Sequence, residues 1–511
     1  MTAYKINITE FLDENIKLFS DRTAVVENEN SITFGELFEK VKVISKAISQ
    51  AVEGRTNQII GVLLPKSINS VVADLAILYS GNAYMNLDVN NPKERLLAII
   101  SQVKPTLIIT LSKYQFTDLL VDRLWFDCYE QNISFSENGL GKNFRSELID
   151  TDPCCVINTS GSTGVPKSVI LNHRSFIDFI EAVRETGFIS NSEIIGSLSP
   201  IIFDIYSFEL CMMMVWGSSL VIIPDSYAAF PAKMLQYIKD KNVSYLFWVP
   251  TIMVNIANMD LLSKIPMQSL RMIWFAGEVF PTVKFNYWKR NLPQCRFVNF
   301  YGPIEITLDC LFHEVKEILK DEEPIPIGKP FRNTSVLLLD EDNNVVKDGV
   351  EGELCIRGSS LAMGYFNNPE KTHLAFVQNP LNNKYPELIY KTGDIAVLDT
   401  NGNYIFKGRK DSLVKRMGYR IELSEIEHVI VDSLKLFKNC CVFYQSQTKD
   451  IVLIYESDKE LPVRDIQKSL MTILPKYMIP TKTFFLERMP RNPNGKIDRN
   501  LLKNQFLELL K

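Results

Sequence analysis

The chain has 511 residues, which is too many for one compact core and favours two to four domains of ordinary size. Hydrophobic residues make up 46% and charged residues 23%, so the composition is that of a folded globular protein and excludes a disordered one. With 56 Lys plus Arg against 60 Asp plus Glu, the net charge is -4, and no long basic run is present. Nucleic acid is therefore not expected as a partner.

The cysteines and the apolar stretches indicate the compartment. Nine cysteines, with adjacent pairs at 154–155 and 440–441, fit neither zinc-ligand spacing nor a secreted disulfide scaffold, and we expect buried thiols. Glu10 and Asp13 precede any apolar stretch long enough for a signal peptide. The stretch 210–224 is shorter than the roughly 20 residues of a membrane span, and we expect a buried helix followed by a buried strand. These features predict a cytoplasmic protein without a membrane partner.

The predicted elements alternate along the chain. Residues 33–51 have the apolar spacing of an amphipathic helix, and continuous apolar runs predict buried strands at 61–64, 106–109, 219–223, 245–248 and 272–275. This pattern predicts an α/β fold: a large N-terminal domain of covered sheets over residues 1–409, with a small β-rich subdomain at about 325–409. Residues 410–511 then form a small C-terminal α+β domain.

A polar loop follows a predicted strand at 154–158. It ends in Pro166 and Lys167 and contains two glycines and four hydroxyl residues. Glycines let backbone N–H groups form a nest for phosphate oxygens, while hydroxyls and an ammonium add charge-assisted hydrogen bonds. The spacing differs from that of a P-loop. A flexible polar loop would explain the composition, but neither the Pro-Lys ending nor the preceding strand. The predicted triphosphate ligands are Thr159, Ser160, Gly161, Ser162, Thr163, Gly164 and Lys167.

Six further motifs follow this loop in order: NFYGPIE at 299–305, GELCIRG at 352–358, GYFNNP at 364–369, YKTGD at 390–394, GRKD at 408–411 and NGKID at 494–498. The series resembles the adenylate-forming superfamily, which includes acyl-CoA synthetases, luciferases and the adenylation domains of nonribosomal peptide synthetases. The resemblance covers nearly the whole chain. It implies an AMP-forming ligase that uses ATP and Mg²⁺.

The resemblance also implies a nucleotide site. Tyr301 would stack on the adenine ring, and Asn299 would reach the amino edge of the base. Asp394 would bind the ribose hydroxyls, with Arg409 nearby. Each residue alone is more simply a packed tyrosine or a surface ion pair, but their joint occurrence favours the nucleotide site.

Other family positions concern the metal, the catalytic lysine and the hinge. Glu305 would hold Mg²⁺, and Gly277 and Glu278 would line the ATP site. Lys496 would lie between the substrate carboxylate and the α-phosphate, so that two anions can approach for in-line attack. Asp411 would be the hinge about which a mobile C-terminal domain turns between adenylation and thiol transfer.

Asp204 points to an amino acid substrate. Amino-acid-activating members of the superfamily place an aspartate here to bind the α-ammonium, whereas a carboxylate without a cation would be costly to bury in an acyl-CoA synthetase. A helix N-terminal acid is the alternative interpretation. The remaining pocket positions carried over from the family are Ile205, Phe208, Phe247, Trp274, Ala276, Phe300, Leu308 and Asp309.

Bulky Phe247, Trp274 and Phe300 predict little space for the substrate side chain, so glycine, alanine or serine would fit. If Asp309 faces the pocket, it favours serine or a short diamino acid over alanine; it could equally point away. Among stand-alone relatives, the D-alanine:carrier-protein ligases are similar in architecture, and FAGEV at 275–279 is similar to their sequence.

Two residues depart from the family pattern. Ile304 stands where a hydroxyl residue is usual, and Ser168 stands where a glycine usually follows the loop lysine. Ile304 removes one expected phosphate contact, but the lysine and both acids remain, so we expect activity.

Adenylation sequence occupies the chain from about residue 10 to about 500, so we expect the acceptor in trans: the phosphopantetheine thiol of a separate acyl or peptidyl carrier protein. The alternatives are an acyl- or aryl-CoA synthetase, for which Asp204 would be an unneeded charge, and a degenerate nucleotide-binding regulator, suggested by Ile304.

Overall fold

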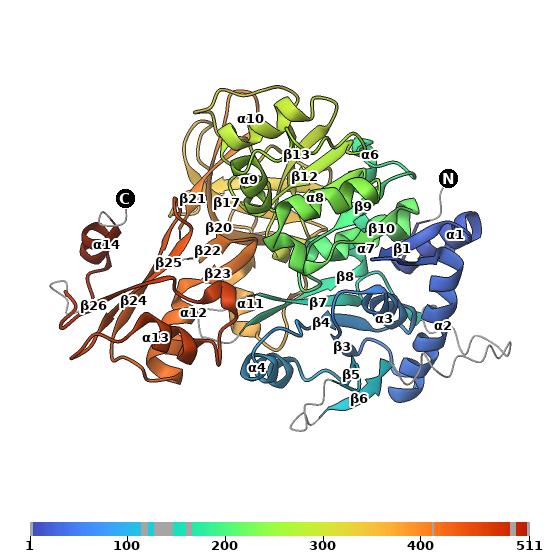
Figure 1. Cartoon of the computed structure of the whole chain (residues 1–511), viewed down its shortest axis with the longest axis horizontal. Coiled ribbons are helices and arrows are strands. Elements are labelled where there is room, and N and C mark those ends of the chain that lie inside the picture. Colours follow the sequence, from blue (N-terminus) through green and yellow to red (C-terminus); the bar gives the residue numbers. More distant parts are fainter. Residues whose placement is uncertain are drawn as a thin grey trace. The chain divides into compact units, whose positions relative to one another are not determined.

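The computed structural model describes residues 4–113, 121–126, 147–159, 166–410, 413–490 and 497–507. The chain divides into two compact units (Figure 1). No helix among these residues is long and apolar enough to cross a membrane. The first unit comprises Met1–Val89, Val103–Ile157 and Ser168–Lys410, and the second comprises Asn90–Gln102, Asn158–Lys167 and Asp411–Lys511.

A nine-stranded sheet of the first unit carries three of the predicted pocket residues, Phe247, Trp274 and Phe300. Its inner pairs are parallel, and antiparallel strands extend both edges. The strand order is β15 (Lys329–Pro330), β14 (Leu311–Glu314), β13 (Arg296–Tyr301), β12 (Met272–Phe275), β11 (Tyr245–Trp248), β9 (Ile194–Ser197), β10 (Ser219–Ile222), β1 (Thr23–Glu27) and β2 (Asn30–Thr33).

The two faces of this sheet bury different side chains, because successive residues of a strand point to opposite faces. Leu246 and Ile273 pack on one face, in a core that also includes residues of three helices: α8 (Pro231–Asp240), α9 (Pro250–Asn258) and α10 (Thr282–Asn291). Tyr245 and Trp274 pack on the other face, in the same core as α7 (Asp204–Trp216) and α6 (His173–Thr186).

Helix α7 and strand β10 confirm the prediction that residues 210–224 form a buried helix followed by a buried strand. The helix ends because Gly217 adopts the left-handed conformation, with φ at +62°. A Cβ atom at Gly217 would also lie 2.7 Å from the Phe19 ring. All residues of α7 after Asp204 are buried, which is why its sequence shows no polar face.

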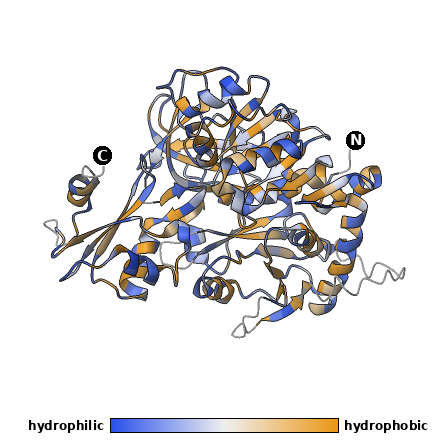
Figure 2. Ribbon diagram, viewed as in Figure 1, coloured by the Kyte–Doolittle hydropathy of each residue, from blue (hydrophilic) through white to orange (hydrophobic). Residues whose placement is uncertain are grey.

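A seven-stranded sheet and its helices form another layer of the first unit. The helix predicted at 33–51 is α2 (Phe34–Ala51), which begins with a capping box between Thr33 and Glu36. Figure 2 shows hydrophobic and hydrophilic residues on different sides of such helices. The other helices are α1 (Thr9–Phe19) and α3 (Ile68–Tyr79). The strand order is β18 (Gly364–Tyr365), β8 (Lys167–Asn172), β7 (Pro153–Thr159), β4 (Ala83–Asn86), β3 (Ile59–Leu63), β5 (Leu107–Thr110) and β6 (Asp122–Trp125).

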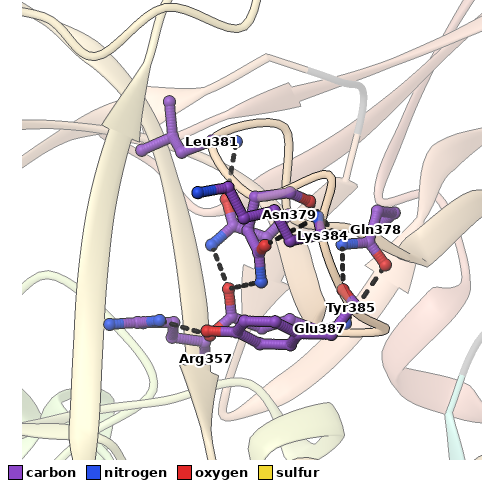
Figure 3. A network of polar contacts seen from close by, with 8 residues as sticks. Arg357, Gln378, Asn379, Leu381, Lys384, Tyr385 and Glu387 are labelled. Carbon is purple, nitrogen blue, oxygen red and sulfur yellow. Dashed lines mark hydrogen bonds and ion pairs between the residues drawn. The ribbon is translucent and has the colours of Figure 1, made fainter.

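A third, antiparallel sheet follows. Its strands are β16 (Thr334–Leu339), β17 (Gly352–Gly358), β20 (Leu388–Leu398), β19 (Phe376–Gln378) and β21 (Tyr404–Arg409), with α11 (Pro369–Ala375) before β19. The turn between β19 and β20 is held by Glu387, whose carboxylate accepts hydrogen bonds from Arg357, Asn379 and Asn382 (Figure 3). These bonds hold the pKa of Glu387 below its usual value.

The second unit is a small α+β structure. Strands β22 (Leu413–Arg416) and β23 (Tyr419–Glu422) form a hairpin, and β24 (Cys440–Gln445), β25 (Asp450–Glu456) and β26 (Lys482–Leu486) form a three-stranded sheet. Its core includes Ile426, Leu453 and Ile466. Its helices are α4 (Lys93–Val103, of which residue 103 groups with the first unit), α12 (Leu423–His428, continued by a π-turn over Val429–Ser433), α13 (Val463–Leu470) and α14 (Arg499–Leu507).

The cysteines are buried free thiols, as predicted. This holds for the eight that the described residues contain. Burial raises the pKa of Cys211 and Cys310 well above the usual value for a thiol, so both remain protonated at neutral pH.

Candidate active site

Three residues predicted for the nucleotide site contact one another in the first unit, together with Thr392, which lies two positions before Asp394. We call Tyr301, Thr392, Asp394 and Arg409 the Asp394 cluster. Arg409 donates a hydrogen bond to Oδ1 of Asp394, and the Tyr301 hydroxyl donates one to Oδ2. Asp394 is 4% exposed. Arg409 also donates to the Thr392 carbonyl at 3.1 Å, and the Thr392 hydroxyl accepts from the Asp394 N–H at 3.0 Å.

Strand register explains this cluster. Asp394 on β20 lies opposite Arg409 on β21, so the ion pair is a cross-strand pair. Burial and the negative charge of Asp394 raise the pKa of Tyr301 well above its usual value, so the phenol remains a neutral donor. Each carboxylate oxygen has two lone pairs and can accept a further bond from a ribose hydroxyl.

The other predicted nucleotide residues lie on neighbouring strand ends. Asn299, on β13, donates from Nδ2 to the Pro326 carbonyl at 2.8 Å, which fixes the orientation of its amide. Glu278 accepts hydrogen bonds from the backbone N–H, at 3.0 Å, and from the hydroxyl of Thr251 at the start of α9. Gly277 has φ at +88°, a conformation that favours glycine.

Glu305 is fully buried on the 3₁₀ turn Ile304–Ile306. Its carboxylate accepts a hydrogen bond from the Tyr365 hydroxyl at 2.8 Å. Ile304 is 6% exposed and supplies no hydrogen-bonding group from its side chain. Ser168 is buried in β8, where its carbonyl accepts from the Phe366 N–H at 2.8 Å.

Four predicted pocket residues pack as one group, which we call the aromatic cluster: Phe208, Phe247, Trp274 and Phe300. The ring centroids of Trp274 and Phe300 are 4.1 Å apart, those of Phe208 and Trp274 are 5.4 Å apart with nearly parallel planes, and those of Phe247 and Trp274 are 5.7 Å apart. Each ring is at most 2% exposed. The rings come from α7, β11, β12 and β13, so all four elements fix their positions.

The remaining pocket positions border these elements. Ile205 and Ala276 are 8% and 5% exposed, and Leu308 and Asp309 are 2% and 5% exposed. Burial is the main cause that raises the pKa of the Tyr245 hydroxyl, and the charges of Glu209 and Asp309 add to the shift; the Tyr245 ring lies 5.3 Å from that of Trp274. Asp309 therefore lies within electrostatic range of a residue in contact with the aromatic cluster.

The segment before Asp309 is conformationally strained. Thr307 and Leu308 have φ values of +57° and +68°, which cost on the order of 1–3 kcal/mol each for residues other than glycine. Gly302 permits this bend, because a Cβ atom there would lie 2.4 Å from the Asp309 Cα and the Leu308 carbonyl oxygen. Local strain of this kind is typical of functional sites.

Asp204 is the first residue of α7 and is partly buried. Its Oδ1 accepts a hydrogen bond from the Ile205 N–H at 2.9 Å. Phe208 lies one turn later on the same helix, in the aromatic cluster. The helix thus carries the predicted ammonium-binding carboxylate and a wall of the predicted side-chain pocket.

The described ends of the predicted phosphate loop, Thr159 and Lys167, group with the second unit. Thr159 ends β7, and Lys167 begins β8, where its Nζ lies 2.6 Å from Glu422 Oε1. The remaining predicted residues of the loop, the hinge Asp411 and the catalytic Lys496 lie outside the described residues. The loop residues concerned are Ser160, Gly161, Ser162, Thr163 and Gly164.

Two contacts near the predicted site residues were not indicated by any sequence pattern: one between Tyr365 and Glu305, and one between Lys66 and Ser199. Tyr365 lies in the quoted GYFNNP motif, but nothing in that motif indicates a bond to Glu305, 60 positions earlier. Lys66 follows β3 and contacts the segment that leads to Asp204, and no motif marks it.

A family model described as AMP-binding enzyme matches residues 12–366. The chain is 32% identical over 511 residues to zwittermicin A synthase ZmaJ of Bacillus cereus, covering 97% of this chain and 94% of that protein. It is 30% identical to tyrocidine synthase 1 of Brevibacillus parabrevis, covering 97% of this chain but 45% of that protein. The chain therefore spans less than half the length of this second relative.

The fold also matches solved structures. The structure of the Vibrio cholerae adenylation domain AlmE in complex with glycyl-adenosine-5'-phosphate superposes with a TM-score of 0.82 at 20% identity, covering 99% of each chain. This likeness agrees with the predicted α/β fold.

Proposed function

The chain belongs to the AMP-binding enzyme family, and from this premise we propose that it activates a small amino acid as its aminoacyl-adenylate. It is an AMP-forming ligase of the type found in nonribosomal peptide synthetases. The observation that carries the choice of an amino acid is Asp204, at the start of the helix that also supplies Phe208 to the aromatic cluster.

In the proposed first step, a carboxylate oxygen of the amino acid attacks the α-phosphorus of ATP, the bond to pyrophosphate breaks, and aminoacyl-AMP forms. The Asp394 cluster would hold the nucleoside: Asp394 would accept from the ribose hydroxyls, and Tyr301 would lie against the adenine. Lys167 and Lys496 would neutralise the phosphates and the attacking carboxylate.

Magnesium would be held through Glu305. Mg²⁺ is usually bound by one or two carboxylates together with substrate phosphates, and Glu305 offers one oxygen-donor carboxylate in a buried position. Among the described residues, no group of three or more His, Cys, Asp or Glu could hold a metal ion. That agrees with an ion held chiefly by the nucleotide, which would neutralise charge on the leaving pyrophosphate.

The aromatic cluster supports a small substrate side chain. Rings with centroids 4.1–6.2 Å apart leave little room between them. In this proposal, the buried Asp309 faces the pocket and would pair with a hydroxyl or a second amine on the substrate. We therefore propose serine or a short diamino acid ahead of alanine and glycine.

We further propose that the aminoacyl group passes to the phosphopantetheine thiol of a carrier protein in trans. The thiol sulfur attacks the acyl carbonyl, AMP leaves, and a thioester remains. In this proposal, the chain turns about Asp411 between the two steps, as adenylate-forming enzymes do.

Pyrophosphate exchange with glycine, L-alanine, L-serine and L-2,3-diaminopropionic acid tests the substrate. We expect the highest kcat/KM with a polar side chain, and we expect Asp309→Ala to reduce that preference by about tenfold, the effect of leaving one polar group unpaired. Asp309→Asn is the matched control, since it keeps the volume and removes the charge. If alanine or glycine is best and Asp309→Ala changes nothing, the role proposed for Asp309 is wrong.

A further inference from the structure

Lys66 is a partly buried lysine that the proposed chemistry does not use. It lies between β3 and α3. Its Nζ donates a hydrogen bond to the Ser199 carbonyl at 2.6 Å and lies 5.7 Å from the centroid of the Tyr206 ring. Ser199 and Tyr206 lie five residues before and two residues after Asp204, so Lys66 contacts the chain on both sides of it.

Glu209 is the buried acid of α7 whose charge acts on this lysine. It is fully buried, and one of its oxygens accepts a hydrogen bond from the Ser197 hydroxyl at the end of β9. The other oxygen has no hydrogen-bond partner among the residues that the structure describes. Burial lowers the pKa of Lys66 and raises the pKa of Glu209 to about 7, and the attraction between the two charges opposes both shifts.

These contacts fix the connection between β9 and α7. Ser197 is held by Glu209 and Ser199 by Lys66, and the Phe203 N–H donates to the Pro200 carbonyl at 3.0 Å. Connections are usually the mobile parts of a fold, and a displacement of about 1 Å at a binding group is enough to impair catalysis. Asp204 follows this connection directly.

A partly buried ammonium loses hydration and remains only if its surroundings compensate for it. Here the compensation comes from the Ser199 carbonyl, the Tyr206 ring, and the acids Glu209 and Asp225. Ser199, Tyr206 and Glu209 lie on α7 or on the connection before it, and Asp225 follows β10. The lysine thus ties the chain after β3 to the part of the molecule that presents Asp204.

We propose that Lys66 is a positioning residue for amino acid recognition, holding the 198–203 connection and the first turn of α7 so that Asp204 stays in place for the substrate ammonium. This inference rests on the proposed function. Lys66 acts through Ser199 and Tyr206, and Glu209 supports it by fixing Ser197 and supplying the opposite charge.

The test measures KM for the amino acid and for ATP separately in pyrophosphate exchange. The amino acid is whichever of glycine, L-alanine, L-serine and L-2,3-diaminopropionic acid the wild type uses best. For Lys66→Met we expect the amino acid KM to rise about tenfold or more, as for the loss of a charge-assisted hydrogen bond, with the ATP KM nearly unchanged. Lys66→Arg, which keeps a charged donor, should recover much of the loss.

Two further variants separate positioning from folding. Lys46→Met, at an exposed position on α2, is the matched control and should behave as the wild type. The double variant Lys66→Met with Glu209→Gln has no unpaired carboxylate and should fold even where the single variant does not. Its amino acid KM should stay raised, because the Ser199 carbonyl still lacks its donor.

An unchanged amino acid KM in Lys66→Met, equal rises for both substrates, or full recovery in the double variant would overturn the role of Lys66 while leaving the proposed function intact. If no amino acid supports pyrophosphate exchange by the wild type, both the role of Lys66 and the proposed function are wrong.

Discussion

The Asp394 cluster and the aromatic cluster hold their side chains by different forces. In the first, an ion pair and hydrogen bonds fix Tyr301, Asp394 and Arg409, so the polar groups already have partners. In the second, packing among Phe208, Phe247, Trp274 and Phe300 fixes the rings. A polar site of this kind is damaged by unpairing its members, whereas a packed site is reshaped by removing volume.

The largest effect is expected at the Asp394 cluster. Asp394→Ala leaves Arg409 without its carboxylate and Tyr301 without its acceptor, and breaking such a buried pair costs about 3–5 kcal/mol. We expect kcat/KM for ATP in pyrophosphate exchange to fall by about 100-fold or more, with a lower melting temperature. Asp394→Asn keeps an acceptor for Tyr301, so its kcat/KM for ATP and its melting temperature should lie between those of Asp394→Ala and the wild type. Wild-type exchange by Asp394→Ala would exclude this carboxylate from the nucleotide site.

The next effect concerns the aromatic cluster. Trp274→Ala should cost about 3–5 kcal/mol of stability and open space among the rings, so that larger amino acids gain relative to small ones in pyrophosphate exchange. Trp288→Ala is the matched control, because Trp288 is equally buried but packs in the core on the other face of the sheet. Both variants should lose stability, and only Trp274→Ala should change the preference. If both variants showed the same shift towards larger amino acids, the shift would follow from lost stability and not from the aromatic cluster.

A smaller effect, on the pH dependence of stability, concerns a buried carboxylate that, unlike Asp394, has no ion pair among the residues that the structure describes. Asp74 is fully buried, accepts hydrogen bonds from Asn86 and Tyr206, and burial raises its pKa to about 7. The folded state therefore binds a proton more tightly than the unfolded chain does. Its stabilising contribution is complete below the unfolded pKa and is lost as pH rises towards 7, at about 1.4 kcal/mol per pH unit.

Asp74→Asn should remove this dependence. Between pH 5 and pH 7, the free energy of unfolding of the wild type should fall relative to that of the variant, as urea denaturation at each pH would measure. Asp458→Asn, at an exposed position, is the control and should leave the slope unchanged. Parallel curves for wild type and Asp74→Asn would contradict the raised pKa.

Local patterns predicted the strands of the fold well, because a strand buried on both faces is apolar throughout. Tyr245–Trp248 and Met272–Phe275 have the predicted bounds. The family motifs identified Tyr301 and Asp394 one at a time, but their hydrogen bond joins residues 93 positions apart, and no local pattern records such a contact.

Other features had no signal in the sequence. The positive φ values of Thr307 and Leu308 occur at residues that usually avoid them, because the tight packing of Gly302 against this segment sets the local backbone. In the sequence, Lys66 is an ordinary polar residue after a strand, and its contact with Ser199 depends on how segments that follow strands of two different sheets pack together. The residues that orient a site are thus harder to predict than the residues that form it.

Amino acid adenylation is tested most directly by pyrophosphate exchange with the wild-type protein, using small amino acids and their analogues without the α-amine. The pairs are glycine with acetate, L-alanine with propionate, L-serine with 3-hydroxypropionate, and L-2,3-diaminopropionic acid with 3-aminopropionate. We expect exchange that depends on ATP, Mg²⁺ and at least one amino acid, with little exchange for the matching analogue because Asp204 would lack its cation. Exchange supported by fatty or aryl acids but by none of these amino acids would contradict it.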